Sequence, residues 1–130
     1  MAEYLPVKNP GQALPLTATA TITGGQLVAV SGVSTVAPAG ANAANWVGVA
    51  AFDAASGDLV TVLAGGVQEL VTTGTVTAGD LVVAAADGTV STLAAVTTPT
   101  AADVTNTRAI LGVALTTATT GLKVQVKLDR

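Results

Sequence analysis

Apolar and polar residues alternate along many short stretches of this chain, with the period of two that is typical of a β-strand. Residues 16–23 alternate strictly, with four threonines on one face and four apolar side chains on the other. Residues 59–63 and 122–128 also alternate, and each segment follows a polar turn. No stretch keeps a helical period over three turns. The pattern therefore predicts a chain built mainly from short strands.

Two segments, 46–52 and 110–115, are apolar on both faces and are predicted to form central strands that are covered on both sides. The first segment contains Trp46 and Phe52, which are expected to anchor the core. Residues 99–108 are predicted to form a loop with a short helical turn.

Glycine-containing pairs separate the predicted strands. Gly24–Gly25 and Ala78–Gly79 are expected to form tight turns, because glycine readily adopts positive φ angles. Asp87–Gly88 lies between the predicted strands 81–86 and 89–93. A two-residue primed turn favours Asp-Gly, so this segment predicts a β-hairpin.

The chain contains an internal duplication. Residues 21–30 and 75–84 have nearly the same sequence at an offset of 54, and residues 48–62 match residues 112–126 at an offset of 64. Two related modules therefore follow one another. The ten extra residues of the second module are expected within residues 85–111.

Close strand spacing with glycine-rich turns indicates an all-β fold, a small antiparallel barrel or sandwich with pseudo-twofold symmetry. Residues 16–130 are predicted to form one domain of two repeat modules, 16–70 and 71–130. Residues 1–15 contain three prolines, which oppose regular pairing and favour an extended N-terminal arm.

The composition indicates a surface that is mostly neutral. Charged residues make up 10% of the chain and hydrophobic residues 50%, whereas the charged share is about 25% in a typical globular protein. Such a surface suits a protein that packs against other proteins. The net charge is −3, and the five basic residues form no stripe for binding nucleic acid, being scattered at Lys8, Arg108, Lys123, Lys127 and Arg130.

Neither a membrane span nor a secretory signal is expected. No apolar run approaches the roughly 20 residues that a membrane helix needs. The first ten residues lack the basic start and apolar centre of a signal peptide, so synthesis in the cytoplasm is the simplest interpretation.

Catalysis and cofactor binding are not expected, because the chain has neither cysteine nor histidine. Asp53, Asp58, Asp80 and Asp103 lack the spacing of a calcium-binding loop, so no metal site is predicted. The segment 87–89 reverses the order of the Asp-Thr-Gly motif of aspartic proteases, and the hairpin explains it.

The residues do not support two other binding functions. The glycine pairs lack the spacing, the following helix and the lysine of a phosphate-binding loop. The threonines at alternate positions in 17–23 and 73–77 suggest an ice-binding array, but two short copies are too few, and natural sheets twist. Strand propensity explains them more simply.

The ordered motifs of the chain resemble those of the capsid cement, or head decoration, proteins of tailed bacteriophages, a family formerly catalogued as a domain of unknown function. The similarity runs nearly end to end and is weakest between residues 91 and 109. The motifs that carry it are Met-Ala-Glu-Tyr-Leu-Pro at 1–6, Thr-Gly-Gly-Gln-Leu-Val at 23–28, Trp-Val-Gly-Val-Ala at 46–50 with Ser-Gly-Asp at 56–58, Thr-Ala-Gly-Asp-Leu-Val at 77–82 and Gly-Val-Ala-Leu at 112–115.

This resemblance implies a small β protein, of the β-tulip or β-clip type, that binds the outside of an expanded icosahedral head and stabilises it against internal pressure. The implied partner is the major capsid protein, the implied oligomer on the capsid is a homotrimer, and the implied location is the outer capsid surface of the virion. The alternatives are a tail-tube or fibre structural protein and, as a different class, a secreted adhesin or ice-binding module.

By analogy with this family, the N-terminal arm is expected to order on the capsid and to pair with a strand of the major capsid protein. Tyr4 and Leu5 are expected to act as anchors and Lys8 as a charge at the rim. The predicted capsid-binding residues are Ala2, Glu3, Tyr4, Leu5, Pro6, Val7, Lys8, Asn9 and Pro10.

Overall fold

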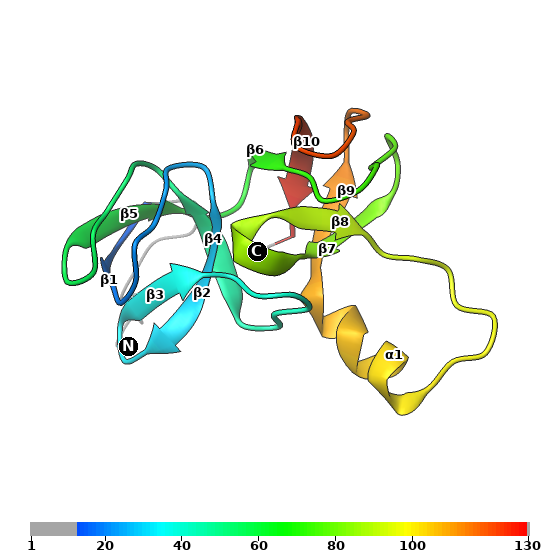
Figure 1. Cartoon of the computed structure of the whole chain (residues 1–130), viewed down its shortest axis with the longest axis horizontal. Coiled ribbons are helices and arrows are strands. Elements are labelled where there is room, and N and C mark those ends of the chain that lie inside the picture. The colour runs from blue at the N-terminus through cyan, green and yellow to red at the C-terminus, as the bar shows by residue number, and fades with distance from the viewer. Residues whose placement is uncertain (1–12, 130) are drawn as a thin grey trace, which may run out of the picture.

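The first half of the chain forms a closed five-stranded barrel (Figure 1). The computed structural model describes residues 13–129. In the barrel the strands follow the order β1-β3-β2-β4-β5. Their bounds are β1 (Leu14–Ala18), β2 (Leu27–Gly32), β3 (Thr35–Pro38), β4 (Trp46–Ala50) and β5 (Leu59–Leu63).

The second half forms a five-stranded sheet beside the barrel, with the order β6-β10-β9-β7-β8 (Figure 1). A short helix, α1 (Ala101–Asn106), and two 3-10 turns, η1 (Ala86–Gly88) and η2 (Thr107–Ala109), accompany these strands. The strand bounds are β6 (Val67–Val71), β7 (Leu81–Ala84), β8 (Val90–Thr92), β9 (Ile110–Ala114) and β10 (Lys123–Leu128).

The strands β6 to β10 correspond to β1 to β5, and around the barrel axis the two sets follow the same order. The two halves differ in how the first strand of each set connects to the third. In the barrel, β1 pairs in parallel with β3 through Thr17–Thr35 and Ala18–Val36. In the second half, only an isolated parallel bridge between Thr72 and Val90 makes the equivalent connection. The all-β prediction is confirmed. The barrel is mixed rather than purely antiparallel, because an alternating pattern defines the faces of a strand and leaves its pairing partner open.

Main-chain contacts repeat at the two sequence offsets. The bridge between Ile22 and Ala54 has its counterpart between Val76 and Ala118. The Gly25 N–H donates to the Ala50 carbonyl at 2.8 Å, and at the equivalent place in the second half Gly79 N–H donates to Ala114 at the same distance. Equivalent turns in the two halves thus use the same hydrogen bonds.

Several predicted boundaries differ from the structure. β1 begins at Leu14, so residues 14 and 15 belong to a strand and not to the arm. β1 then ends at Ala18, and Ile22 rejoins the barrel through a single bridge instead of extending one strand from 16 to 23. The boundary predicted between the two repeat modules, at residues 70 and 71, falls inside β6, which spans 67–71.

Two groups of buried side chains stabilise the protein. One fills the barrel and includes Val28, Val36 and Val62. The other combines the interior of the second half with barrel residues that include Leu27, Trp46 and Val49. The larger core therefore joins the two halves.

The two predicted aromatic anchors have different environments. Trp46 is 1% exposed and lies in the core that joins the halves. Phe52 is 49% exposed, so its prediction as a core anchor is wrong. β4 ends at Ala50 and the chain bends at residues 51–52, where the backbone of Phe52 lies against Gly24.

The predicted hairpin around Asp87–Gly88 is confirmed. β7 and β8 pair antiparallel, and both Asp87 (φ 56°) and Gly88 (φ 72°) have the positive φ angles of a type I′ turn. The predicted strands 81–86 and 89–93 are shortened to 81–84 and 90–92.

The ten extra residues of the second half lie between β8 and β9. This connection spans residues 93–109, whereas β3 and β4 are joined by residues 39–45. It contains α1, which is longer than the single helical turn predicted. Thr100 caps α1, because its side chain accepts a hydrogen bond from Asp103 N–H while the Asp103 carboxylate accepts from Thr100 N–H.

Candidate functional site

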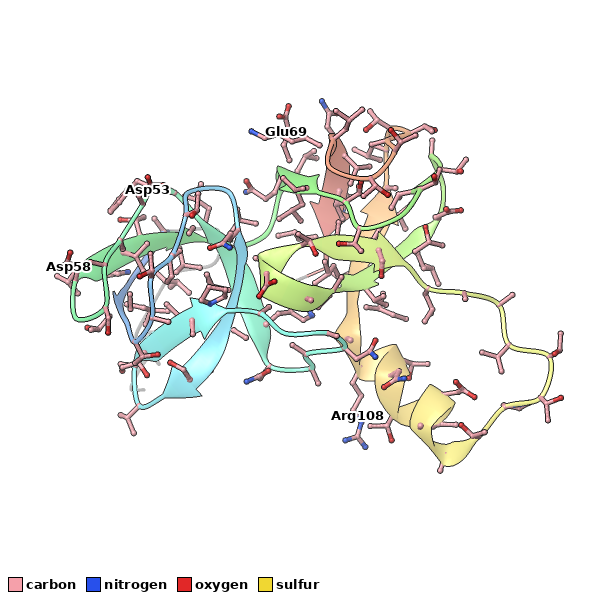
Figure 2. The ribbon with its side chains drawn as sticks, viewed as in Figure 1. Asp53, Asp58, Glu69 and Arg108 are labelled. Atoms are coloured by element: carbon pink, nitrogen blue, oxygen red, sulfur yellow. The ribbon has the colours of Figure 1, made fainter. Side chains whose placement is uncertain are left out.

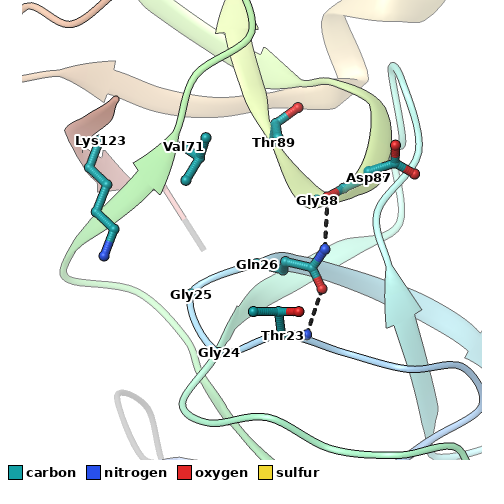
Figure 3. A pocket seen from close by; sticks show the side chains of 9 residues that line it. All are labelled: Thr23, Gly24, Gly25, Gln26, Val71, Asp87, Gly88, Thr89 and Lys123. Atoms are coloured by element: carbon teal, nitrogen blue, oxygen red, sulfur yellow. Dashed lines mark hydrogen bonds between the residues drawn. The ribbon is translucent and has the colours of Figure 1, made fainter. Parts of the chain in front are cut away.

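A groove of about 230 Å³ lies where the barrel meets the second half (Figure 3). The barrel contributes the turn before β2, and the second half contributes the β7–β8 hairpin together with residues of β6 and β10. The lining residues are Thr23, Gly24, Gly25, Gln26, Val71, Asp87, Gly88, Thr89 and Lys123.

Gln26 connects the two walls of the groove. Its side-chain Nε2 donates to the main-chain oxygen of Asp87 at 3.0 Å, and its Oε1 accepts from Thr23 N–H at 2.8 Å (Figure 3). Because both ends of the amide are engaged, Gln26 serves chiefly to hold the hairpin against the turn.

The hairpin also contacts the barrel through its main chain. The Gly88 N–H donates to the Ala39 carbonyl at 2.8 Å, and Asn42 N–H donates to the Ala84 carbonyl at 2.9 Å. A Cβ atom at Gly88 would lie 2.8 Å from Gln26 Cβ and 2.9 Å from the Leu27 oxygen. Glycine is therefore required at residue 88 for the two halves to approach this closely.

The charged groups of the groove are Asp87 and Lys123, from the hairpin and from β10. Lys123 lies along one wall, across from Gln26 (Figure 3). Such a groove can accept a small polar group or a short stretch of main chain.

Side chains that bind metals do not cluster among the described residues. Within 13–129, no three His, Cys, Asp or Glu side chains lie close enough together to hold a metal ion. Asp53 and Asp58 lie on the barrel, whereas Glu69 and Arg108 lie at opposite ends of the second half (Figure 2). In the same part of the chain, no helix is long and apolar enough to cross a membrane.

The predicted capsid-binding arm, Ala2 to Pro10, lies outside the described residues. Trp46 lies beneath the surface, and Phe52 lies on it. The groove was not predicted, because Gln26 and Asp87 are 61 positions apart and neither belongs to a recognisable binding motif. Only the Asp-Gly turn that presents the Asp87 carbonyl was evident in the sequence.

Comparisons with known proteins indicate a phage origin. The family model for phage cement proteins matches residues 8–129. No curated protein matches the chain. Among solved structures, the N base of the head fiber gp8.5 of bacteriophage phi29 has the same fold, with a TM-score of 0.65 and 19% sequence identity over 91% of this chain and 93% of that one.

Proposed function

We propose that this chain, which belongs to the phage cement protein family, binds the outer surface of an expanded phage head and stabilises the shell against internal pressure. The observation that carries the proposal is the family match over residues 8–129. Family membership makes the protein a structural component of the phage head, in a class that is not an enzyme class.

The proposed partner is the major capsid protein, and the proposed assembly on the head is a homotrimer. A trimer contacts several capsid subunits at once, so modest individual contacts add up through their high effective concentration. The low share of charged residues, 10%, supports this role, because little desolvation of charge opposes packing against protein.

Residues Ala2 to Pro10 are the proposed capsid-binding arm. Tyr4 and Leu5 supply large apolar side chains, which dominate the energy of many protein interfaces when they fill pockets. Lys8 adds one charge at the rim. This segment lies outside the repeated sequence, so it is available for a function that the two related halves do not share.

The test uses purified heads that lack the protein, in expanded and unexpanded forms. The full chain should bind expanded heads only, and deletion of residues 2–10 should reduce occupancy, measured by cryo-microscopy, to background. The variant Tyr4→Ala/Leu5→Ala should weaken binding at least about tenfold. Val104→Ala, which changes an exposed apolar residue on α1, is the matched control and should bind normally.

Unchanged occupancy of the deletion variant, with its fold verified by circular dichroism, would refute the role of the arm. Equal binding of the full chain to expanded and unexpanded heads would refute the expansion-specific function.

A fibre base is the second candidate, favoured by the fold shared with the head fiber base of phi29. The two functions differ in their effect on the head. A cement raises the temperature at which filled heads release DNA, whereas a fibre base binds without changing it. DNA release measured with a fluorescent dye, with and without the protein, separates them.

A further inference from the structure

A row of exposed side chains crosses the second sheet. Leu81 on β7 pairs with Val113 on β9, Val113 pairs with Lys127 on β10, and Lys127 pairs with Val67 on β6. Paired residues of neighbouring strands share a face, so these four side chains form one row on the outer face. We call this set, Val67, Lys127, Val113 and Leu81, the outer row.

The barrel contains the equivalent row, and there Leu27 and Val49 lie in an interface, whereas Leu63 is 36% exposed. Leu27 pairs with Val49, and Val49 pairs with Leu63, at the offsets of 54 and 64 that relate the two halves. Leu27 and Val49 are 0% and 4% exposed and pack in the core that joins the halves. Their counterparts Leu81 and Val113 are 46% and 38% exposed.

The outer row thus keeps the apolar character of a covered face. Leu115 follows β9, is also exposed, and extends the apolar surface beside Gln125, to whose carbonyl its N–H donates at 2.8 Å. The aliphatic stem of Lys127 can cover apolar surface while its ammonium remains at the edge. A contiguous exposed apolar face of this kind is typical of a protein interface.

The distribution of charged residues suggests which surface binds the outer row. The described basic residues, Arg108, Lys123 and Lys127, all lie in the second half, which also carries five acidic residues, and Lys127 is the charged member of the outer row. The charged residues of the barrel, within 14–63, are Asp53 and Asp58. Asp58 ends the β4–β5 loop and Leu59, which is 67% exposed, begins β5, so a carboxylate and an exposed apolar side chain follow one another along the chain there.

We propose that the outer row binds the end of the β4–β5 loop and the start of β5 of a second copy of this chain, with Asp58 opposite Lys127 and Leu59 against Leu81 and Val113. Asp58 lies at the end of its own barrel that faces away from the second sheet (Figure 2), so the contact joins different copies. Such a head-to-tail contact uses two different surfaces and generates a ring where the rotation between successive copies closes. This inference deepens the proposed function by specifying the interface of the homotrimer.

The first test is sedimentation velocity of the full chain over a range of concentrations, without heads. The wild-type chain should form a closed oligomer. Leu81→Thr/Val113→Thr keeps residues that are favourable in strands and should raise the dissociation constant at least about tenfold. Val104→Thr, an equally conservative change at an exposed site on α1, should leave assembly unchanged.

The second test is charge reversal. Lys127→Glu and Asp58→Lys should each weaken assembly, and the combination should restore it, because the pair is then reversed. Wild-type assembly should also weaken as salt screens the pair.

A chain that stays monomeric at all concentrations would overturn the proposal, as would a Leu81→Thr/Val113→Thr variant that assembles normally. Normal assembly of that variant combined with loss of head binding would instead assign the outer row to the capsid. Because assembly is measured without heads, failure here is distinct from failure of the capsid-binding function.

Discussion

The side-chain Nε2 of Gln26 lies 3.0 Å from the main-chain oxygen of Asp87 and joins the barrel to the second half. The counterpart of Gln26 in the repeat is Asp80, whose Oδ2 accepts hydrogen bonds from Thr77 N–H at 3.0 Å and from the Thr92 hydroxyl at 2.9 Å. This position of the repeat therefore stabilises the same local turn in both copies, and in the first copy it also connects the two halves.

Replacement of Gln26 with Glu should lower the free energy of unfolding by about 1–2 kcal/mol at neutral pH, because the donor to the Asp87 carbonyl is lost and a carboxylate faces it. The acceptor for Thr23 N–H remains. Gln68→Glu is the matched control, since the Gln68 amide donates locally, to the Gly65 carbonyl three residues away at 3.2 Å. Urea denaturation measures both changes, and equal losses would contradict the coupling role of Gln26.

Replacement of Gly88 with Ala should destabilise the protein by about 3 kcal/mol or more, because the new methyl group meets Gln26 Cβ and the Leu27 oxygen in addition to straining the backbone. Gly57→Ala has a similar positive φ, 94°, with open space around the Cβ position, and should cost only about 1–2 kcal/mol. Thermal unfolding separates the two contributions, and similar melting temperatures would argue against close packing at Gly88.

Replacement of Gly112 with Ala should cost about 3 kcal/mol or more, because a Cβ atom there collides with the main-chain oxygen of Lys127. The repeated Gly48 meets the Leu63 oxygen in the same way, so Gly48→Ala should behave similarly. Gly40→Ala places its methyl group in open space and is the control. A stable Gly112→Ala protein, measured by denaturant unfolding, would show that the strands adjust easily.

The Gly-Val-Ala motif at 48–50 and 112–114 illustrates what sequence reasoning can recover. Its repetition was evident, and it marks two equivalent strands. The reason for its glycine was not evident, because the obstructing carbonyls of Leu63 and Lys127 come from another strand. A repeated glycine indicates that a side chain is not tolerated at that position. It does not identify the atom with which a side chain would collide.

The candidate groove was accessible to prediction only in part. Its two turns, at Gly24–Gly25 and Asp87–Gly88, follow from local backbone preferences. Their meeting does not, because it depends on how the larger core around Trp46 draws the halves together. The exposure of Phe52 was missed for a similar reason, since hydrophobicity indicates a preference for burial and does not specify where a strand ends.

The sequence by itself determined the strand-rich character, the main turns and the offsets of the duplication, because period-two patterning and glycine or Asp-Gly preferences act between neighbouring residues. Only the tertiary structure decided the parallel pairing of β1 with β3 and the junction between the halves. It also gave equivalent residues different environments, with Leu27 buried and Leu81 exposed. These features depend on which distant segments meet, and two nearly identical local sequences carry no information about their different surroundings.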